Sequence, residues 1–387
     1  MRTTRMREGA PPNAGRFDEV LKIAVLRGGG LGDLLFTMPA LDALADAYPE
    51  AEIVLLGTPL HAELLRDRPG PVSRVELLPR ARGVYGGEHE DDPRGTGAFM
   101  RRMRAEAFDL ACQMHGGGRY SNPFLLALGA RHTVGTATAD AAPLERTLPY
   151  VYYQHEVVRW VETAALAGAP SVGPEPTVAV TPGERRRGRA LTGAGPEPLV
   201  VIHPGATDPR RRWPAERFTD LALRCAADGM RVVLVGEGDD AALADAIARH
   251  ASRAAGDAVV SLAGRLTLGD LAGVLAVADI CVGNDSGPRH LAQAVGTPTA
   301  SIYWVGNLIN AGPLTRASHR VQLSWTTHCP VCGRDATQVG WTAPRCEHDE
   351  SFVADVSVDA VYDDVRALLE GAPAAPVTAT TAPLRGT

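Results

Sequence analysis

The sequence lacks long apolar segments and contains few aromatic residues. Phe, Trp and Tyr make up only 5% of the 387 residues, and no stretch approaches the roughly eighteen consecutive apolar residues of a membrane helix. Arginines stand at positions 2, 5 and 7, but the apolar core of a signal peptide does not follow them. We therefore expect no membrane-spanning helix and a cytoplasmic location.

The chain also lacks a large charge of either sign. Its 39 Lys and Arg residues nearly balance its 45 Asp and Glu residues, which gives a formal net charge of −6. Such a charge provides no general attraction to nucleic acid or to an anionic membrane surface. We expect no nucleic-acid partner and at most peripheral membrane contact, so any phosphate group must be recognised by a local site.

Cysteine is scarce, and the spacing of the six cysteines does not suggest a disulfide framework. Cys112, Cys225 and Cys281 occur within apolar segments, where cysteine usually behaves as a small core residue. The other three cysteines are clustered near the C-terminus and are considered below.

Apolar residues, by contrast, make up 45% of the chain, which is enough for sizeable cores. A chain of this length is expected to form two domains. From residue 21 onward, short aliphatic segments alternate with segments of helical periodicity, a pattern typical of a parallel sheet covered by helices. We predict an N-terminal domain at 19–180 with a mobile surface loop at 80–98, preceded by a disordered arm at 1–18.

The second half of the chain repeats this pattern more clearly. From PLVVIHPG (198–205) onward, five predicted strands alternate with four predicted helices. We predict a C-terminal domain at 196–354, joined to the first by a Pro- and Gly-rich linker at 170–198 that contains one short strand, TVAV. An amphipathic helix at 355–370 is expected to pack across both domains, and 371–387 to be a disordered tail.

Two doubly wound domains in tandem imply a cleft between them, and ligands of such sheets bind beyond the carboxyl ends of the strands. The first strand is followed by RGGGLGD (27–33). Asp33 stands where a dinucleotide fingerprint needs its third glycine, which argues against a nicotinamide fold. The glycines, such as Gly30, instead allow a substrate to approach the backbone. Asp33 is then either a general base for a hydroxyl group or a simple helix cap.

A second glycine-rich segment, HGGGRYSN, follows another strand of the first domain. His115 and Arg119 stand beside its three glycines. The segment is either an acceptor or anion pocket, or a flexible turn in which Asn122 caps the next helix.

Two strand ends of the second domain carry groups suited to a nucleotide. HPGATDPRRRWP offers Ala206, Thr207 and Arg211, and backbone N–H groups with guanidinium groups are the donors that a phosphate needs. The alternative is a solvated arginine-rich surface. VGEGDD offers Glu237, which could accept hydrogen bonds from ribose hydroxyls unless this acidic run merely caps a helix.

The stretch GNDSGPRHL follows a buried strand and opens a helix. Ser286 and Gly287 would present N–H groups to an anion at the positive end of this helix, and Pro288 suits its first turn. His290 could reach the same anion. Asp285 would repel a bare phosphate, so it is better suited to order the loop or to contact a transferred sugar.

Three segments together resemble glycosyltransferase family nine, the ADP-heptose:lipopolysaccharide heptosyltransferases. They are RGGGLGDLLFTMPALDALADAYPEAEIVLLG, HPGATDPRRRWPAERF and GNDSGPRHLAQAVGTPTASIYW, within a resemblance that runs from about residue 21 to about residue 368. The resemblance implies an α/β GT-B fold, with two facing Rossmann-like domains, parallel sheets and an interdomain cleft. The acceptor would bind in the N-terminal domain and the nucleotide sugar in the C-terminal domain.

The resemblance also implies an inverting, metal-independent glycosyltransferase that needs no cofactor for catalysis. It would move a heptose or a related sugar from a nucleotide diphosphate sugar, ADP-linked, to a hydroxyl group of a glycan or small-molecule acceptor. A nucleotide-sugar epimerase of the same fold is the alternative. An NAD-dependent oxidoreductase is a weaker one, because Asp33 interrupts the glycine loop.

Matched to the family's motifs, Asp33 becomes the general base, and Gly30, His115 and Arg119 are the candidates for acceptor binding. The implied donor-binding residues are Ala206, Thr207, Arg211, Glu237, Asp285, Ser286, Gly287, Pro288 and His290.

The Cys-rich segment 328–350 carries a separate motif. Cys329 and Cys332 form a C-x-x-C pair, and Cys346 and His348 follow as a C-x-H pair, which together supply four ligands that zinc accepts. The segment is therefore either a structural zinc site or a cluster of reduced thiols that packs a loop.

Overall fold

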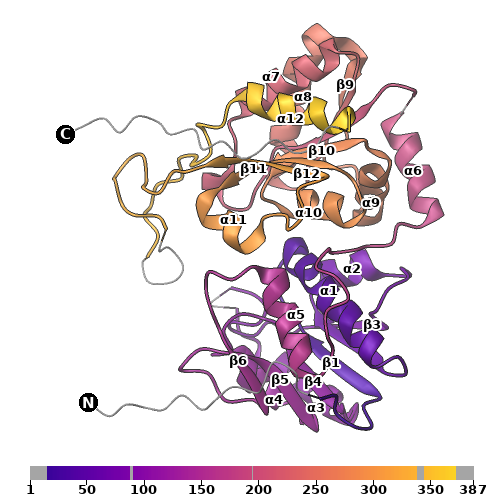
Figure 1. Ribbon diagram of the computed structural model, residues 1–387, viewed down its shortest axis with the longest axis vertical. Coiled ribbons are helices and arrows are strands. Elements are labelled where there is room, and N and C mark those ends of the chain that lie inside the picture. Colours follow the sequence, from indigo (N-terminus) through magenta and orange to yellow (C-terminus); the bar gives the residue numbers. More distant parts are fainter. Residues whose placement is uncertain (1–14, 88–89, 194, 338–343, 372–387) are drawn as a thin grey trace.

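Figure 1 shows two α/β domains stacked on one another in a computed structural model of the chain. The structure describes residues 15–87, 90–193, 195–337 and 344–371. Each domain contains a six-stranded sheet in which all neighbouring strands are parallel. The α/β GT-B architecture predicted from the sequence is confirmed.

The first sheet has the strand order β3-β2-β1-β4-β5-β6. Its central strands are short aliphatic runs buried on both faces, as parallel strands covered by helices usually are. The strands are β1 (Lys22–Leu26), β2 (Glu52–Gly57), β3 (Arg74–Leu77), β4 (Leu110–Gln113), β5 (His132–Ala137) and β6 (Arg146–Pro149). The helices of this half are α1 (Leu31–Ala47), α2 (Pro59–Leu65), α3 (Pro93–Ala105), α4 (Ser121–Leu126) and α5 (Glu156–Leu166).

The second sheet has the order β12-β11-β10-β7-β8-β9. Its strands are β7 (Leu199–His203), β8 (Arg231–Leu234), β9 (Val259–Ser261), β10 (Ile280–Asn284), β11 (Thr299–Trp304) and β12 (His319–Ser324). The helices are α6 (Pro182–Thr192), α7 (Ala215–Ala227), α8 (Asp239–Ala255), α9 (Leu268–Val277), α10 (Gly287–Ala294), α11 (Val305–Ala311) and α12 (Val358–Leu369), with two short 3₁₀ turns, η1 (Pro209–Arg211) and η2 (Gly256–Ala258). In the described part of the chain, no helix is both long and apolar enough to cross a bilayer.

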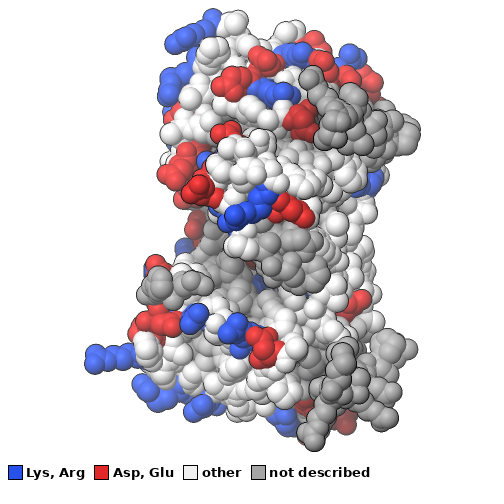
Figure 2. All heavy atoms as spheres, turned by 90° about the vertical axis from the view of Figure 1, so that its left-hand side faces the viewer, with Lys and Arg blue, Asp and Glu red and all other residues white. Residues whose placement is uncertain are grey.

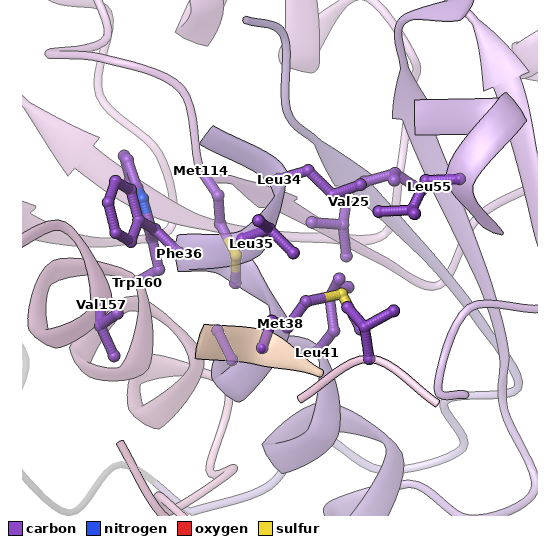
Figure 3. Packing of buried hydrophobic residues seen from close by; sticks show 14 of the residues in the cluster. Val25, Leu34, Leu35, Phe36, Met38, Leu41, Leu55, Met114, Val157 and Trp160 are labelled. Atoms are coloured by element: carbon purple, nitrogen blue, oxygen red, sulfur yellow. The ribbon is translucent and has the colours of Figure 1, made fainter. Parts of the chain in front are cut away.

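Helix α1 lies at the centre of the first domain's core. Figure 3 shows its side chains, Leu34 among them, packed with Val25 of β1 and Leu55 of β2, and with Val157 and Trp160 of α5 in the same cluster. The five residues named in the preceding sentence are at most 1% exposed. Burial on this scale stabilises the start of α1, which is where Asp33 stands.

The two domains meet where α1 faces α10, and two glycines allow them to come close. A Cβ atom on Gly287 would lie 3.0 Å from Cβ of Leu31, and one on Gly32 would lie 3.3 Å from the His290 ring. The rings of Phe36 and His290 also make an edge contact, with centroids 4.6 Å apart. The loops that follow β1 and β10 are therefore neighbours across the domain interface.

The structure corrects two predictions about surface segments. The arm was expected to extend to residue 18, but Phe17 is buried, stacks on the His132 ring and donates its N–H to the Tyr48 hydroxyl. The loop predicted at 80–98 contains the start of α3, which Asp92 caps. Phe99 and two methionines of α3 pack into the core, and this burial outweighs the two glycines inside the helix. Residues 1–14 and 88–89 lie outside the described residues.

The linker and the C-terminal helix also differ from expectation. Residues 177–180 form no strand in the described structure, and α6 follows them with a Thr181–Glu184 capping box and packs on α9. The predicted helix at 355–370 is present as α12, but it packs on α7 and on β10, β11 and β12 rather than across both domains. Its Asp364 accepts a hydrogen bond from Gln322 of β12. Of the predicted tail, residues 372–387 lie outside the described residues.

Candidate functional site

A cavity of about 550 Å³ lies between the domains, at the carboxyl ends of strands from both sheets. The first domain contributes Leu60, Phe36 and the residues from Gly30 to Asp33 at the start of α1. The second contributes residues at the ends of β7, β8, β9 and β10 and two residues of α11, which follows β11. All nine predicted donor-binding residues line this one cavity, together with Asp33 and Gly30. Figure 2 shows charges of both signs interspersed over the face that it displays.

Asp33 has the capping role, one of the two roles that the sequence left open, and its carboxylate also lines the cavity. Its Oδ2 accepts the N–H of Gly30 at 2.8 Å, which caps α1, and its Oδ1 accepts from Nη2 of Arg27 at 2.6 Å. The side chain is nevertheless 47% exposed and faces the cavity. Gly29 beside it has a φ of +92°, and a Cβ there would lie 2.4 Å from the carboxylate, so a glycine is required.

Across the cavity, Asp285 organises the loop that opens α10. It is 3% exposed, and its carboxylate accepts hydrogen bonds from Nη1 of Arg211 at 2.9 Å and from Nδ2 of Asn307 at 2.7 Å. Nε2 of His290 donates to it at 3.0 Å. Burial alone would raise the pKa of Asp285, but the His290 hydrogen bond and the nearby arginine charges hold that pKa well below its ordinary value.

His290 is neutral, and its tautomer is determined by its neighbours. Nη2 of Arg289 lies 2.8 Å from Nδ1, and because a guanidinium group only donates, Nδ1 must accept and Nε2 must carry the proton. Burial and the Arg289 charge lower the pKa of His290 to about 4. Both ring nitrogens thus bond to protein partners. His290 was expected to contact an anion, but in the structure it donates a hydrogen bond to Asp285 instead.

One part of the cavity is lined by small residues and by the guanidinium group of Arg211. Ser286 is the N-cap residue of α10, whose first N–H groups carry a partial positive charge. Ala206, Thr207 and Gly287 add little bulk, and Arg211 is 24% exposed beside them. This combination of N–H groups and a guanidinium group is suited to a diphosphate.

Another part of the cavity is mostly apolar. It is lined by Val235 and Glu237 after β8, and by Leu266, Leu268 and Leu271 around the start of α9. An apolar slot next to one exposed carboxylate is suited to a nucleobase and its ribose.

Two of the three predicted acceptor residues do not line the cavity. Gly30 lines it, whereas His115 and Arg119 lie outside its lining. His115 accepts the N–H of Gly28 at 3.2 Å and so supports the loop behind Asp33. Arg119 is 65% exposed, pairs with Asp140 at 3.4 Å and lies over the Tyr120 ring.

Several lining residues were not predicted from the sequence. His203 ends β7, and its Nδ1 lies 3.1 Å from Oγ of Ser286, while Asp240 and Asn307 line the cavity nearby. His203 could have been found, because it stands at a strand end like the others. Asn307 follows β11 inside α11, a helix that the sequence did not suggest.

The Cys-rich segment forms a compact group of possible metal ligands. The donor atoms of Cys329, Cys332, Cys346 and His348 all lie within 4.8 Å of one another. A backbone N–H group of Cys332 lowers the pKa of the Cys329 thiol, which favours the thiolate form. Three thiols and an imidazole at this spacing fit a tetrahedral metal site.

This metal-ligand group adjoins the segment 206–212, which follows β7. The segment that follows His348 donates from the Phe352 N–H to the Arg210 carbonyl at 2.7 Å and from the Ser351 hydroxyl to the Arg212 carbonyl at 2.6 Å. These two bonds hold the backbone on both sides of Arg211.

The chain is similar in sequence to known proteins. The sequence model of glycosyltransferase family 9 (heptosyltransferase) matches residues 96–337, more than half of the chain. The lipooligosaccharide heptosyltransferase 2 of Haemophilus influenzae is 31% identical over 95 residues, which are 24% of this chain and 28% of that protein. The lipopolysaccharide heptosyltransferase 2 of Escherichia coli is 25% identical over 161 residues, 42% of this chain and 43% of that protein. The chain thus spans less than half the length of each of these relatives.

Solved structures share the fold over nearly the whole chain. The glycosyl transferase family 9 structure from Veillonella parvula has a TM-score of 0.74 at 19% identity and covers 92% of this chain and 99% of that one. The E. coli ADP-heptose lps heptosyltransferase II has a TM-score of 0.71 at 20% identity, with 90% and 99% covered. An iron-containing dodecameric glycosyltransferase from E. coli, TibC, has a TM-score of 0.52 at 13% identity, with 92% and 80% covered. By its sequence match, this chain belongs to glycosyltransferase family 9 (heptosyltransferase).

Proposed function

We propose that the protein transfers a heptose from ADP-heptose to a hydroxyl group of a lipopolysaccharide-type acceptor, with inversion at the anomeric carbon and without a catalytic metal. The donor follows the name of a structural neighbour, ADP-heptose lps heptosyltransferase II, and the acceptor follows the names of the two curated relatives. The observation that carries the proposal is one cavity that joins nine donor-binding candidates of the second domain to Asp33 of the first.

In this proposal the C-terminal domain binds the nucleotide sugar and the N-terminal domain binds the acceptor. The nucleobase would occupy the apolar slot near Leu271, with Glu237 at the ribose, and the diphosphate would lie against Arg211 and the start of α10. Gly30 would leave room for the acceptor, which enters from the side of Asp33. His115 and Arg119 lie outside the cavity lining, so we assign them to the support and the rim of the acceptor side.

The chemistry is a single displacement. Asp33 removes the proton from the acceptor hydroxyl, whose oxygen attacks the anomeric carbon while the bond from that carbon to the diphosphate oxygen breaks. The departing ADP gains negative charge, which Arg211 and the N–H groups of α10 stabilise. Asp285, which holds Arg211 in position, would not itself contact the phosphates.

We assign Cys329, Cys332, Cys346 and His348 to a structural metal site, with zinc as the metal. Three thiolates and one imidazole bind zinc in many closed structural sites, and they also accept iron. A structural neighbour, TibC, is described as iron-containing. All four positions of the tetrahedron are filled by protein, so the metal would serve the fold and take no part in the transfer.

The proposal is tested by incubating the protein with ADP-heptose and lipopolysaccharide truncated in its inner core, and by following ADP release and acceptor mass. We expect Asp33→Ala to abolish transfer, because it removes the proposed general base, while ADP-heptose binding measured by calorimetry changes less than about threefold. Asp46→Ala, on the same helix, serves as the matched control with normal activity. An active Asp33→Ala protein, or ADP-heptose that does not bind, would contradict the proposal.

A further inference from the structure

The Asp33 carboxylate shares its cation with a second carboxylate. Arg27 is 2% exposed, directly behind Asp33, and its Nη2 donates both to Oδ1 of Asp33 at 2.6 Å and to Oε2 of Glu156 at 3.4 Å. Its Nη1 donates to the carbonyl of Met114 at 2.8 Å, and its Nε donates to the carbonyl of Asp33 at 2.9 Å. Arg27 is therefore held in one orientation and touches both carboxylates with the same nitrogen.

Glu156 is held as firmly from the other side. It opens α5, where the partial positive charge of the helix start favours a carboxylate, and its side chain is 19% exposed. Nε1 of Trp160 donates to its Oε2 at 3.1 Å, and Arg159 donates to its Oε1. The Trp160 ring also lies 4.8 Å beneath the Arg27 guanidinium group. Glu156 thus has a defined place in a buried network and is not a mobile surface acid.

We propose that Glu156 is a positioning residue that sets the basicity of Asp33 through Arg27. This inference rests on the proposed role of Asp33 as general base. A carboxylate that faces an uncompensated guanidinium group holds its proton weakly and is a poor base. Glu156 offsets part of the Arg27 charge, so Asp33 keeps its orientation while it remains able to take a proton. Arg27 is buried, so water screens its charge little on the side that faces away from the cavity.

Other titratable groups face this network from neighbouring elements. Tyr150, after β6, lies 4.3 Å under the Arg159 guanidinium group. The groups on the Asp33 side are three histidines, His61 of α2, His115 after β4 and His290 of α10. Burial lowers the pKa of each of these histidines to about 4, so they carry no charge near neutral pH. Among the described residues, the charged side chains joined in this network with Asp33 are Arg27, Glu156 and Arg159, and Arg211 and Asp285 line the opposite side of the cavity.

The test is a direct titration of Asp33 in Glu156→Gln, read by the carbon NMR signal of the labelled carboxyl group and assigned with Asp33→Asn. Glu162→Gln is the matched control, because Glu162 is an exposed glutamate on the same helix. We expect the Asp33 midpoint to fall by about one pH unit in Glu156→Gln and to stay unchanged in Glu162→Gln. In turnover, Glu156→Gln should lower kcat about tenfold, move its acidic limb to lower pH and leave the KM for the donor unchanged.

Glu156→Asp should restore part of the kcat, because it returns the charge to the network. A wild-type Asp33 midpoint in Glu156→Gln would overturn the inference, even if kcat falls, since the loss would then be structural. Failure of the proposed function looks different. In that case Asp33→Asn remains active or ADP-heptose does not bind, while the NMR midpoint still reports whether Glu156 acts on Asp33.

Discussion

At the scale of single residues, Asp285 joins several side chains around the start of α10 by hydrogen bonds. Arg211, Asn307 and His290 all donate to its buried carboxylate. Its role is to order the cationic side of the cavity, one of the two roles that the sequence suggested. In the proposed donor site, the position of Arg211 therefore depends on an acid that would not itself contact the phosphates.

We expect Asp285→Ala to weaken ADP binding about tenfold and to lower the free energy of unfolding by about 3 kcal/mol, because three donors lose their buried partner. Isothermal titration calorimetry and urea unfolding measure the two effects. Asp239→Ala, an exposed residue at the start of α8, is the control and should change neither. An unchanged free energy of unfolding in Asp285→Ala would contradict the inference that these three hydrogen bonds stabilise the fold.

The buried histidines make a prediction about acid stability. Burial lowers the pKa to about 4 for each residue of a set: His61, His115, His203, His290 and His319. The unfolded chain binds these protons near pH 6.5, so it holds more protons than the folded chain between pH 6.5 and about 4. The free energy of unfolding should fall across this window as pH decreases, by about 1.4 kcal/mol per pH unit for each histidine.

Urea unfolding at a series of pH values measures this slope. His319→Asn, in β12, should reduce it by about one proton. Carboxylates with a lowered pKa, such as Asp285, lose their contribution only below about pH 4, so the two effects are separable. A flat curve between pH 6.5 and 4 would contradict the assignment of neutral buried histidines.

At the scale of elements, the segment 206–212, which contains Arg211, is held by a segment far away in the chain. Residues 351–356 follow the metal-ligand group and bond to the carbonyls of Arg210 and Arg212, while Nε1 of Trp213 donates to the Val356 carbonyl at 2.9 Å. The Arg210 guanidinium group lies 5.5 Å from the Phe352 ring centroid. A metal at the Cys-rich segment would thus stabilise the start of this segment and, through it, the position of Arg211.

Loss of the metal should therefore weaken ADP binding, although no metal-ligand residue lines the cavity. We expect Cys346→Ser to lose the bound metal, to lower Tm by several degrees and to weaken ADP binding about tenfold. Elemental analysis, thermal unfolding and calorimetry give the three readouts, and Glu347→Gln, an exposed non-ligand between two ligands, is the control. Full ADP affinity in metal-free Cys346→Ser would contradict the inferred link between the metal-ligand group and the position of Arg211.

At the scale of the whole molecule, side chains of the two domains also bond to each other outside the cavity. Arg68, after α2, forms a two-pronged pair with Glu184 of α6, at 2.5 and 3.1 Å, and their side chains are 3% and 11% exposed. Leu268 of α9 donates its N–H to Glu63 of α2 at 3.1 Å. On the other side, Nδ2 of Asn310 donates to the Tyr152 carbonyl at 2.6 Å.

Breaking the Arg68–Glu184 pair should loosen the domains. We expect Arg68→Ala to destabilise the protein by about 3 kcal/mol, because Glu184 keeps a buried charge without its partner. Small-angle scattering should show a larger radius of gyration, and kcat should fall as the cleft closes less often. Arg66→Ala, an exposed neighbour with the same change of charge, is the control. An unchanged radius of gyration would show that other contacts suffice to hold the domains.

Much of the fold could be predicted because its signals are local. Parallel strands covered on both faces are short aliphatic runs, and glycine-rich loops with an acid or a cation mark their ends, as in RGGGLGD and GNDSGPRHL. Elements without such signals were missed. β6 and β12 are half-polar edge strands, and α3 is rich in glycine and arginine and owes its stability to Phe99 and two methionines in the core.

The sequence by itself therefore determined the two α/β halves and the residues at their strand ends that line the cavity, Asp33 among them. The contacts that give those residues their properties arise only in the folded molecule. Arg27 and Glu156 are 129 positions apart, Arg211 and Asp285 are 74 apart, and the Arg68–Glu184 pair spans 116. No local pattern encodes such pairs, because which side chains meet depends on how helices pack on the sheets and how the two domains face each other.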